Sequence, residues 1–158
     1  MTELSAPVLR VADAAREFGL EIALRVMPAS TRTAEEAAAA CQCSVGEIVK
    51  SLVFRGVESG KAILLLVSGA NRVDETRVAT AIGEPIERPD AAFVRAVTGF
   101  AIGGIPPFAH QTRLACWIDR DLMGFERVFA AAGTPNAIFA VSPTALRDAI
   151  DAPVITMA

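Results

Sequence analysis

The sequence predicts an α/β fold in a single domain, residues 1–158, built on a mixed β-sheet surrounded by helices. The length suits one domain with a full-sized core. Hydrophobic residues make up 53% of the chain and charged residues 21%, the composition of a compact globule. Candidate strands occur in hairpin-like pairs and also alternate with candidate helices. This arrangement favours a mixed sheet over a doubly wound parallel sheet.

The first third of the chain is expected to form one strand between two helices. Apolar residues recur at helical spacing from Ala6 to Phe18 and predict an amphipathic helix. Apolar and polar residues alternate from Ile22 to Val26, which indicates a strand, and residues 28–32 follow as a loop. Thr33 then opens a capping box for an alanine-rich helix that runs from Ala34 to about Cys41.

A hairpin is predicted after a second capping box, which joins Ser44 to Glu47. Its strands are Val49–Arg55 and Lys61–Ser68, with a glycine-flanked turn between them. The second strand is almost continuously apolar, so we expect it to be buried on both faces. Two further helices are predicted: one that begins at Asp74 and ends at Ile82, and one over Ala91–Val97 that Asp90 begins.

The stretch from Thr98 to His110 is apolar, yet it holds three glycines and two adjacent prolines. The prolines lack amide donors, so we predict a short buried strand, Phe100–Ile102, that runs into a rigid loop. Gly103 and Gly104 permit positive φ and the close approach of another group. Two interpretations stay open: a backbone that grips an oxygen-rich ligand, or a tight turn between core strands.

The C-terminal part is expected to contain three strands and a last helix. Leu114–Ile118 is the first strand, and Arg127–Ala132 and Ala137–Val141 form a hairpin. Residues 133–136, Gly-Thr-Pro-Asn, are a strong turn signal between the last two. Ser142 followed by proline then opens a helix over Thr144–Ile150.

The net charge of −3 and the pI of about 5.2 argue against broad binding of duplex DNA, which basic proteins usually perform. A local basic patch that grips one end of a nucleic acid stays open, as does a scatter of solubilising charges. The arginines that surround the central stretch in sequence are Arg72, Arg77, Arg88, Arg95 and Arg113.

No membrane span, leader or metal site is expected. The longest unbroken apolar run, Ala62–Val67, is too short to cross a bilayer, and the N-terminus, with acidic Glu3, lacks the pattern of a leader. We therefore expect a cytoplasmic protein. Cys41 and Cys43 do not have a usual zinc spacing and the chain has one histidine, so the cysteines are expected to be reduced and mostly buried.

Lys50 is the foremost candidate for chemistry because it begins an apolar strand just after a capped turn. It could clamp a phosphate or polarise an ester carbonyl, or it could be a strand-end lysine that reaches water. His110 could be a general base or a ligand contact, or simply a partly exposed loop residue. Thr31 could bind a ligand, or its hydroxyl could take part in capping and turn formation in the loop at residues 28–32. Asp119 and Asp121 are expected to be surface charges in a turn.

Several segments together resemble the YbaK/EbsC/ProX family of prolyl-tRNA-editing-like aminoacyl-tRNA deacylases. The resemblance covers nearly the whole chain in the right order. The segments that carry it are G-E-I-V-K-S-L-V-F at Gly46–Phe54, T-G-F-A-I-G-G-I-P-P-F at Thr98–Phe108, R-L-A-C-W-I-D at Arg113–Asp119, and the strand–turn–strand at Val128–Ser142.

The resemblance implies a fold with a mixed, strongly curved sheet, and hydrolysis of the ester that joins a wrong amino acid to the 3′ end of tRNA, without a metal or organic cofactor. It places the family's essential lysine on Lys50, its glycine-to-proline loop on Gly103 and Pro107, and a facing glycine on Gly133. Amides at Gly103 and Gly104 could then orient the carbonyl and a water. Some relatives carry a histidine in the turn where this chain has Asn136, so their alanine specificity does not transfer.

The resulting hypothesis is a trans-acting deacylase for mischarged tRNA, foremost tRNA-Pro that carries cysteine, alanine or a similar small amino acid. A pocket lined by Ile102, Ile105 and Phe108 would suit such side chains. Prolyl-tRNA synthetase is a possible partner that would help supply tRNA selectivity. The alternative is a catalytically silent module of the same fold that only docks tRNA or a synthetase.

Overall fold

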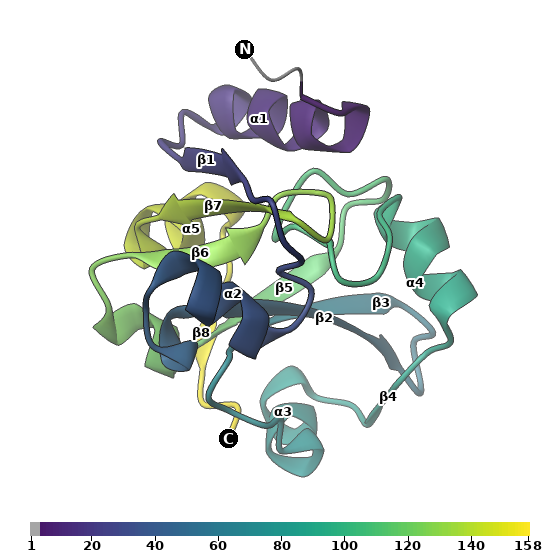
Figure 1. The fold of residues 1–158 in the computed structure, drawn as a ribbon. Coiled ribbons are helices and arrows are strands. Elements are labelled where there is room, and N and C mark those ends of the chain that lie inside the picture. Colours follow the sequence, from purple (N-terminus) through teal and green to yellow (C-terminus); the bar gives the residue numbers. More distant parts are fainter. Residues whose placement is uncertain (1–3) are drawn as a thin grey trace.

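The computed structural model describes residues 4–158, so Glu3 lies outside the described residues. Its helices are α1 (Ala6–Phe18), α2 (Ala34–Cys41), α3 (Glu75–Ile82), α4 (Ala91–Thr98) and α5 (Pro143–Ile150), with 3-10 turns η1 (Val45–Glu47) and η2 (Arg120–Gly124). Its strands are β1 (Ala23–Val26), β2 (Val49–Gly56), β3 (Ala62–Ser68), β4 (Ile86–Glu87), β5 (Ala115–Asp119), β6 (Val128–Ala131), β7 (Ala137–Val141) and β8 (Val154–Ile155). The mixed α/β class predicted from the sequence is confirmed (Figure 1).

The strands form two sheets. One sheet has the order β1-β7-β6 and is antiparallel, and the other has the order β4-β2-β3-β5-β8 and is mixed. A single parallel bridge between Ile48 and Phe129 joins them at the start of β2 and β6. The predicted hairpins β2–β3 and β6–β7 are both present, with Lys50 opposite Val67 in the first. The sequence alone did not show that the strands would divide between two sheets.

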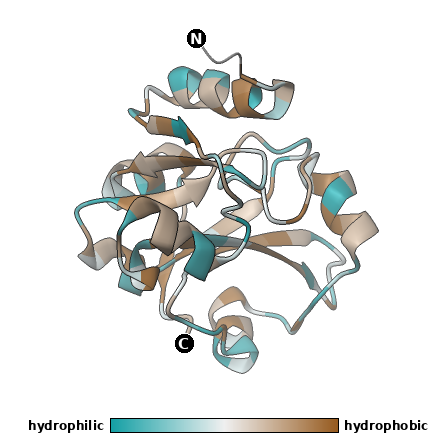
Figure 2. Cartoon of the chain, in the orientation of Figure 1, coloured by the Kyte–Doolittle hydropathy of each residue, from teal (hydrophilic) through white to brown (hydrophobic). Residues whose placement is uncertain are grey.

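The core lies between the two sheets and on the far side of the mixed one. Strand β3 is buried on both faces, as predicted: Leu64 and Leu66 pack in the larger cluster, and Leu65 and Val67 pack toward α3 and the C-terminal segment. Figure 2 shows the hydrophobic residues concentrated on the central strands. Among residues 4–158, no helix has both the length and the apolar character needed to cross a membrane.

The predicted helix caps account for most of the helix starts. The Thr33 hydroxyl accepts the amide of Glu36 at 3.1 Å, and the Glu36 carboxylate accepts the amide of Thr33 at 3.2 Å, which completes the first capping box. Ser44 and Glu47 form the second, and Asp74, Asp90 and Ser142 each accept an amide from the first turn of their helix. Because each cap satisfies an otherwise free amide, it fixes where its helix begins.

The predicted strand over Phe100–Ile102 is wrong, because this segment is an irregular loop that forms no ladder. Helix α4 extends to Thr98, whose hydroxyl donates to the carbonyl of Val94 and accepts the amide of Phe100, so the chain turns at once. Arg10 of α1 holds the loop from outside, since its guanidinium donates to the carbonyls of Gly99 and Ala109 and stacks 4.4 Å from the Phe100 ring centroid.

The remaining differences are short elements and one buried charge. Strands β4 and β8 and the turn η2 were not predicted, and two-residue strands depend on partners distant in sequence. Asp119 is 1% exposed, so its prediction as a surface charge is wrong, whereas Asp121 is exposed. The three cysteines are free; Cys41 is buried, and Cys43 and Cys116 are half-buried.

Candidate functional site

A cavity of about 320 Å³ opens where the two sheets separate. Beyond the Ile48–Phe129 bridge, β2 pairs with β3 and β6 pairs with β7, so the facing edges of β2 and β6 diverge. The two sides of the cavity are lined by residues 48–52 of the β2 segment and 129–131 of β6. Its remaining lining includes residues 31–34, Ile102, Gly103 and Ile105. Diverging edges leave backbone groups without ladder partners, which suits a polar ligand.

Lys50 lies on the β2 side of this cavity and is half-buried. Its ammonium donates to the main-chain carbonyl of Asn71. Burial lowers the pKa of Lys50 below 10.5, while the negative charges of Glu35 and Asp119 act in the opposite direction and Arg88 adds to the lowering. An ammonium with one carbonyl partner retains two N–H donors for a ligand.

Gly103 lines the same cavity with φ +94°, a conformation that favours glycine. A Cβ atom at this position would lie 2.5 Å from Cγ of Arg32, so the arginine stem crosses the glycine closely. Arg32 is exposed, lines the cavity, and has no ion-pair partner within residues 4–158. Arg32 was not predicted from the sequence, where the available signal was a cation next to Thr31 in the loop before a capped helix.

Thr31 and Gly104 connect the cavity to the turn at residues 133–136. The amide and hydroxyl of Thr31, which is buried, both donate to the carbonyl of Pro135, at 2.7 and 3.2 Å. The amide of Gly133 donates to the carbonyl of Gly104 at 2.9 Å. A Cβ on Gly104 would lie 2.8 Å from the backbone of Thr134. The absence of a side chain at Gly104 therefore lets the turn at residues 133–136 pack closely against the loop that carries Gly103.

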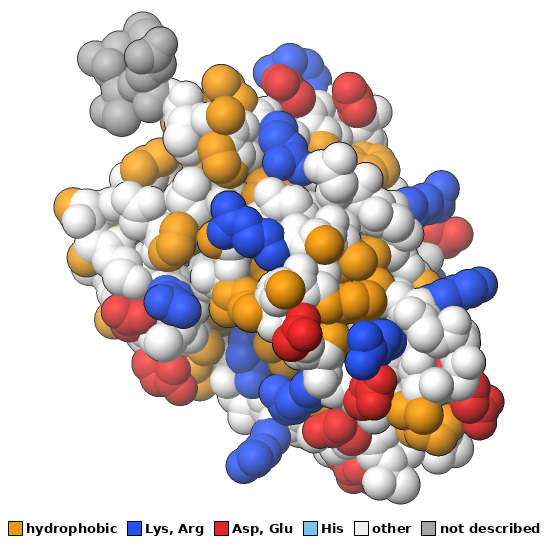
Figure 3. All heavy atoms as spheres, turned by 90° about the vertical axis from the view of Figure 1, so that its right-hand side faces the viewer, with side chains coloured by type: hydrophobic (Ala, Val, Ile, Leu, Met, Phe, Trp, Pro, Cys, Tyr) orange, Lys and Arg blue, Asp and Glu red, His pale blue; other side chains and the backbone are white. Residues whose placement is uncertain are grey.

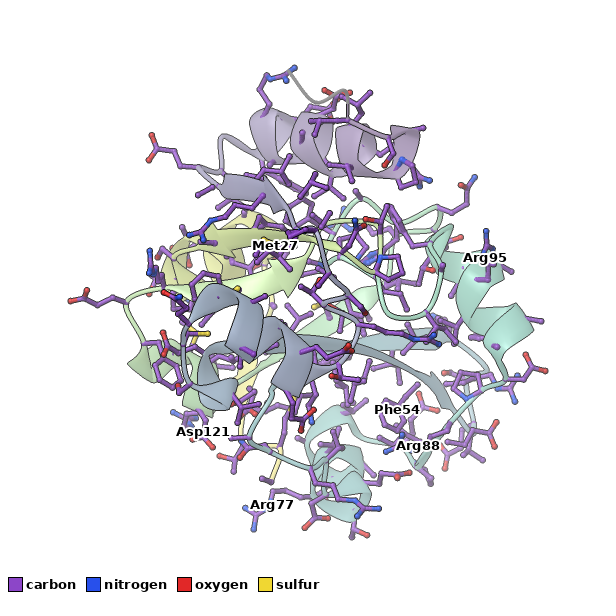
Figure 4. The ribbon with its side chains drawn as sticks, in the orientation of Figure 1. Met27, Phe54, Arg77, Arg88, Arg95 and Asp121 are labelled. Atoms are coloured by element: carbon purple, nitrogen blue, oxygen red, sulfur yellow. The ribbon has the colours of Figure 1, made fainter. Side chains whose placement is uncertain are left out.

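Gly133 and Asn136 support this turn from inside. Gly133 has φ +103°, and a Cβ there would lie 2.8 Å from the carbonyl oxygen of Pro7. The Asn136 amide donates to the carbonyl of Met27 at 3.2 Å, and its oxygen accepts the Thr134 hydroxyl at 2.9 Å. Figure 4 shows Met27 beside β7, where the chain leaves β1. Neither residue lines the cavity of Lys50, and these contacts lie within the turn and with the chain at Pro7 and Met27.

His110 and Pro107 line a different cavity, of about 360 Å³, together with Phe108. His110 is half-buried, and its Nε2 lies 2.7 Å from the carbonyl oxygen of Pro106, which requires Nε2–H to be the donor. Burial lowers the pKa of His110 below 6.5, and nearby Arg10 adds to the lowering. The structure thus separates His110 and Pro107 from Lys50. Of the three predicted pocket residues, Ile102 and Ile105 line the Lys50 cavity and Phe108 does not.

The five arginines considered for a basic patch have different surroundings. Arg77 pairs with Asp74 at 4.0 Å and Arg88 with Glu75 at 3.6 Å. Figure 4 shows Arg77 below α3, Arg88 near Phe54 and Arg95 on α4, well spread over the molecule. On the face in Figure 3, basic side chains are interspersed with acidic and apolar ones. Scattered charges describe this face better than one continuous patch.

The site combines cationic groups with a small apolar chamber. Ile105, Ala130 and Ile138 supply apolar walls, while Lys50 and Arg32 supply positive charge near the opening. Ser51 also lines the cavity, and its hydroxyl is buried without a hydrogen-bond partner in the structure. No cluster of three or more histidine, cysteine, aspartate or glutamate residues that could hold a metal occurs within residues 4–158. The chemistry available is electrostatic support of an ester or phosphate and exclusion of bulky groups.

Comparisons with known proteins show the family and the fold of the chain. The profile of the aminoacyl-tRNA editing domain family matches residues 28–149. The chain is 31% identical over 119 residues, 75% of each protein, to the uncharacterized protein YwhH of Bacillus subtilis. It is 44% identical to a protein whose crystal structure is described as a candidate trans-editing enzyme for prolyl tRNA synthetase, with 98% of each chain covered and a TM-score of 0.89. A hypothetical protein of solved structure is 30% identical, covers 94% of this chain and 98% of its own, and has a TM-score of 0.88.

Proposed function

The chain belongs to the aminoacyl-tRNA editing domain family, and on that premise we propose that residues 1–158 act as one trans-acting deacylase domain for mischarged tRNA. The observation that carries the proposal is the convergence of Lys50, Gly103 and Arg32 on one small cavity between the diverging sheets. The proposed substrate is tRNA-Pro that carries cysteine, alanine or a similarly short amino acid. A relative described as a candidate trans-editing enzyme for prolyl tRNA synthetase supports this choice.

The proposed reaction is hydrolysis of the aminoacyl ester. Water adds to the carbonyl carbon, the bond to the ribose oxygen breaks, and free amino acid and the tRNA 3′ hydroxyl result. Charge develops on the carbonyl oxygen as water adds, and the Lys50 ammonium and the Gly103 amide are the proposed donors to it. Because the ester is already activated, positioning and charge stabilisation suffice without a nucleophilic serine or cysteine.

Arg32 is proposed to bind the terminal phosphate of the tRNA. Its guanidinium is exposed at the cavity opening and has no ion-pair partner within residues 4–158, so it is available to an anion. The anticodon would lie far outside this cavity. We therefore propose that a partner such as prolyl-tRNA synthetase contributes to tRNA selection.

The cavity size suits a short amino acid side chain. At about 320 Å³ it must hold the terminal ribose region as well as the aminoacyl group, and Ile105 and Ile138 narrow it. Apolar pockets discriminate single methylene groups by only about 1–3 kcal/mol. We therefore expect activity on cysteine, alanine and serine that differs by factors of ten to a few hundred rather than absolute selection.

The decisive experiment is a panel of tRNA-Pro charged with cysteine, alanine, serine or proline, in which ester loss is followed with and without the protein. Faster loss of a small noncognate amino acid than of proline supports the proposal. No acceleration with any member of the panel would exclude the deacylase and favour the alternative, a silent module that docks tRNA or a synthetase. Binding of uncharged tRNA in that case would identify the module.

A further inference from the structure

Asp119 is a fully buried carboxylate at the end of β5, close to the Lys50 cavity but outside it. Its Oδ2 accepts the amide of Ser68 at 3.1 Å and the side-chain amide of Asn71 at 2.9 Å. Its Oδ1 accepts the amide of Asp121 at 3.1 Å. Burial of a carboxylate is costly unless such donors compensate for the lost water. The arrangement thus ties the ends of β3 and β5 to the loop that carries Asn71.

Asn71 connects this carboxylate to the candidate catalytic lysine. Its side-chain nitrogen donates to Asp119 at 2.9 Å and to Asp121 at 2.7 Å, so the orientation of the amide is fixed by two acceptors. Its main-chain carbonyl accepts the ammonium of Lys50. Asn71 therefore forms hydrogen bonds to two carboxylates through its side chain and to the Lys50 ammonium through its main-chain carbonyl. The proposed reaction uses neither Asn71 nor Asp119 directly.

We propose that Asn71 and Asp119 are positioning residues for Lys50: Asp119 fixes the side chain of Asn71, and the main-chain carbonyl of Asn71 holds the Lys50 ammonium at the cavity. A lysine has four rotatable side-chain bonds, so an ammonium without this link would sample many positions. Holding it in place before the substrate arrives lowers the cost of stabilising charge in the transition state. This inference rests on the proposed function for its kinetic consequence, but the link itself can be measured without substrate.

The charges around Lys50 also give Asp119 an electrostatic role. Burial is the largest influence and disfavours the protonated ammonium, as Arg88 also does, whereas Glu35 of α2 and then Asp119 of β5 favour it. Arg88 lies beside Phe54 (Figure 4), with its guanidinium carbon 5.2 Å from the centroid of the Phe54 ring. Loss of the Asp119 charge leaves burial and Arg88 opposed by Glu35 alone. The ammonium then loses its proton at a lower pH.

The first test measures the lysines directly. The sequence contains two lysines, Lys50 and Lys61, so a protein made with lysine labelled with carbon-13 at Cε gives two side-chain signals, and Lys50→Arg assigns them. We expect the Lys50 signal to titrate at a lower pH in Asp119→Asn than in the parent protein, because the variant lacks a charge that favours the ammonium. Glu126→Gln removes one negative charge from an exposed residue outside the link and serves as the matched control. An unchanged Lys50 titration in folded Asp119→Asn would overturn the electrostatic role.

The second test separates positioning from folding. Asn71→Ser removes both hydrogen bonds to the carboxylates but keeps the backbone, and Asn71 is half-buried between exposed neighbours. We expect kcat to fall about tenfold with KM within twofold, because the ammonium acts in the transition state. We also expect greater mobility of the Lys50 Cε signal in carbon-13 relaxation of Asn71→Ser, while the mobility of the Lys61 signal stays as in the parent. The control, Glu126→Gln, should keep the kcat, the Lys50 mobility and the thermal midpoint of the parent.

The outcomes distinguish the two proposals. A parent protein that hydrolyses no aminoacyl-tRNA excludes the deacylase, yet the titration and relaxation of Lys50 still decide whether the link exists. An active parent whose Asn71→Ser variant retains kcat and an immobile Lys50 signal excludes the positioning role alone. Should Asp119→Asn not fold, Asn71→Ser still decides the positioning role through kcat and the relaxation of the Lys50 signal.

Discussion

Lys50 is the residue on which the proposed activity depends most. Lys50→Ala should lower kcat/KM at least about tenfold to a hundredfold, since charge-assisted hydrogen bonds contribute roughly 1.5–3 kcal/mol. Lys50→Arg should fail as well, because the planar guanidinium does not fit the position fixed by the carbonyl of Asn71. Deacylation kinetics and thermal unfolding of both variants provide the measurement. Parent-level rates from Lys50→Ala across the aminoacyl-tRNA panel would remove Lys50 from the site.

Ser51 gives a prediction in which stability and function separate. Its buried hydroxyl has no hydrogen-bond partner, and an unsatisfied buried polar group costs about 1–3 kcal/mol. Ser51→Ala should therefore raise the free energy of unfolding by about 1 kcal/mol, measured by urea denaturation. A decrease would show that the hydroxyl is satisfied in solution. If activity falls while stability rises, the hydroxyl serves the substrate.

His110 should make the fold sensitive to mild acid. Its pKa in the folded state is lowered below 6.5 by burial, so the unfolded chain binds the proton first as the pH falls. Stability should therefore be full above about pH 6.5 and decrease as the pH falls from there to the lower folded pKa. His110→Gln should remove this part of the pH dependence, followed by urea denaturation at several pH values. If the parent and His110→Gln lost the same amount of stability as the pH falls below about 6.5, groups other than His110, such as carboxylates, would account for the loss.

At the scale of elements, the two adjacent glycines in the loop at residues 99–110 have different neighbours, so replacing each should have a different effect. A Cβ on Gly103 would lie 2.5 Å from Cγ of Arg32 in a positive-φ position, whereas a Cβ on Gly104 would lie 2.8 Å from the backbone of Thr134. Both alanine variants should cost about 1–3 kcal/mol of stability, Gly103→Ala through its backbone conformation and Gly104→Ala by pushing the turn away, but Gly103→Ala should lower activity more. Gly124→Ala, which meets nothing within 4 Å, is the control. Comparable losses of stability and activity in both variants would mean that neither glycine serves the ligand separately.

The sequence predicted elements well where the signal is local. Capping residues such as Thr33 and Asp90 fixed helix starts, and the glycine-flanked turn fixed the first hairpin, because each acts within a few residues. The failed strand at Phe100–Ile102 shows the limit. Its apolar pattern is that of a buried segment, but only Phe100 is buried there, beneath Arg10, whereas Ile102 is 46% exposed. Tertiary contacts of this kind leave no periodic pattern.

The same limit applies to the site. Lys50 and Gly103 could be identified from their motifs, and the structure brings both to one cavity. Arg32 was not identified, since its place next to Thr31 in a loop before a capped helix is a weak signal for an exposed arginine. His110 could not be separated from Lys50 either, because only the folded chain shows that they line different cavities. Asp119 was misjudged because its partners, Ser68 and Asn71, lie about fifty residues away in sequence.

At the scale of the whole molecule, the cavity exists because two sheets meet at one bridge and then diverge. Its walls come from β2, β6 and the loop at residues 102–105, which are far apart in sequence. A ligand in the cavity contacts both sheets at once and should restrain their relative motion. Binding should therefore protect the facing edges of both sheets together and not only one loop.

Hydrogen exchange with a stable amide analogue of an aminoacyl-adenosine tests this expectation. Slower exchange is expected together at residues 48–52, 102–105 and 129–131, because the analogue covers the free edges of both sheets and supplies partners to their backbone groups. Residues 107–116, beside the second cavity, serve as the internal control and should be unchanged. Lys50→Ala should weaken the protection at all three segments. Protection confined to residues 107–116 would place the ligand beside His110 and contradict the assignment of the Lys50 cavity.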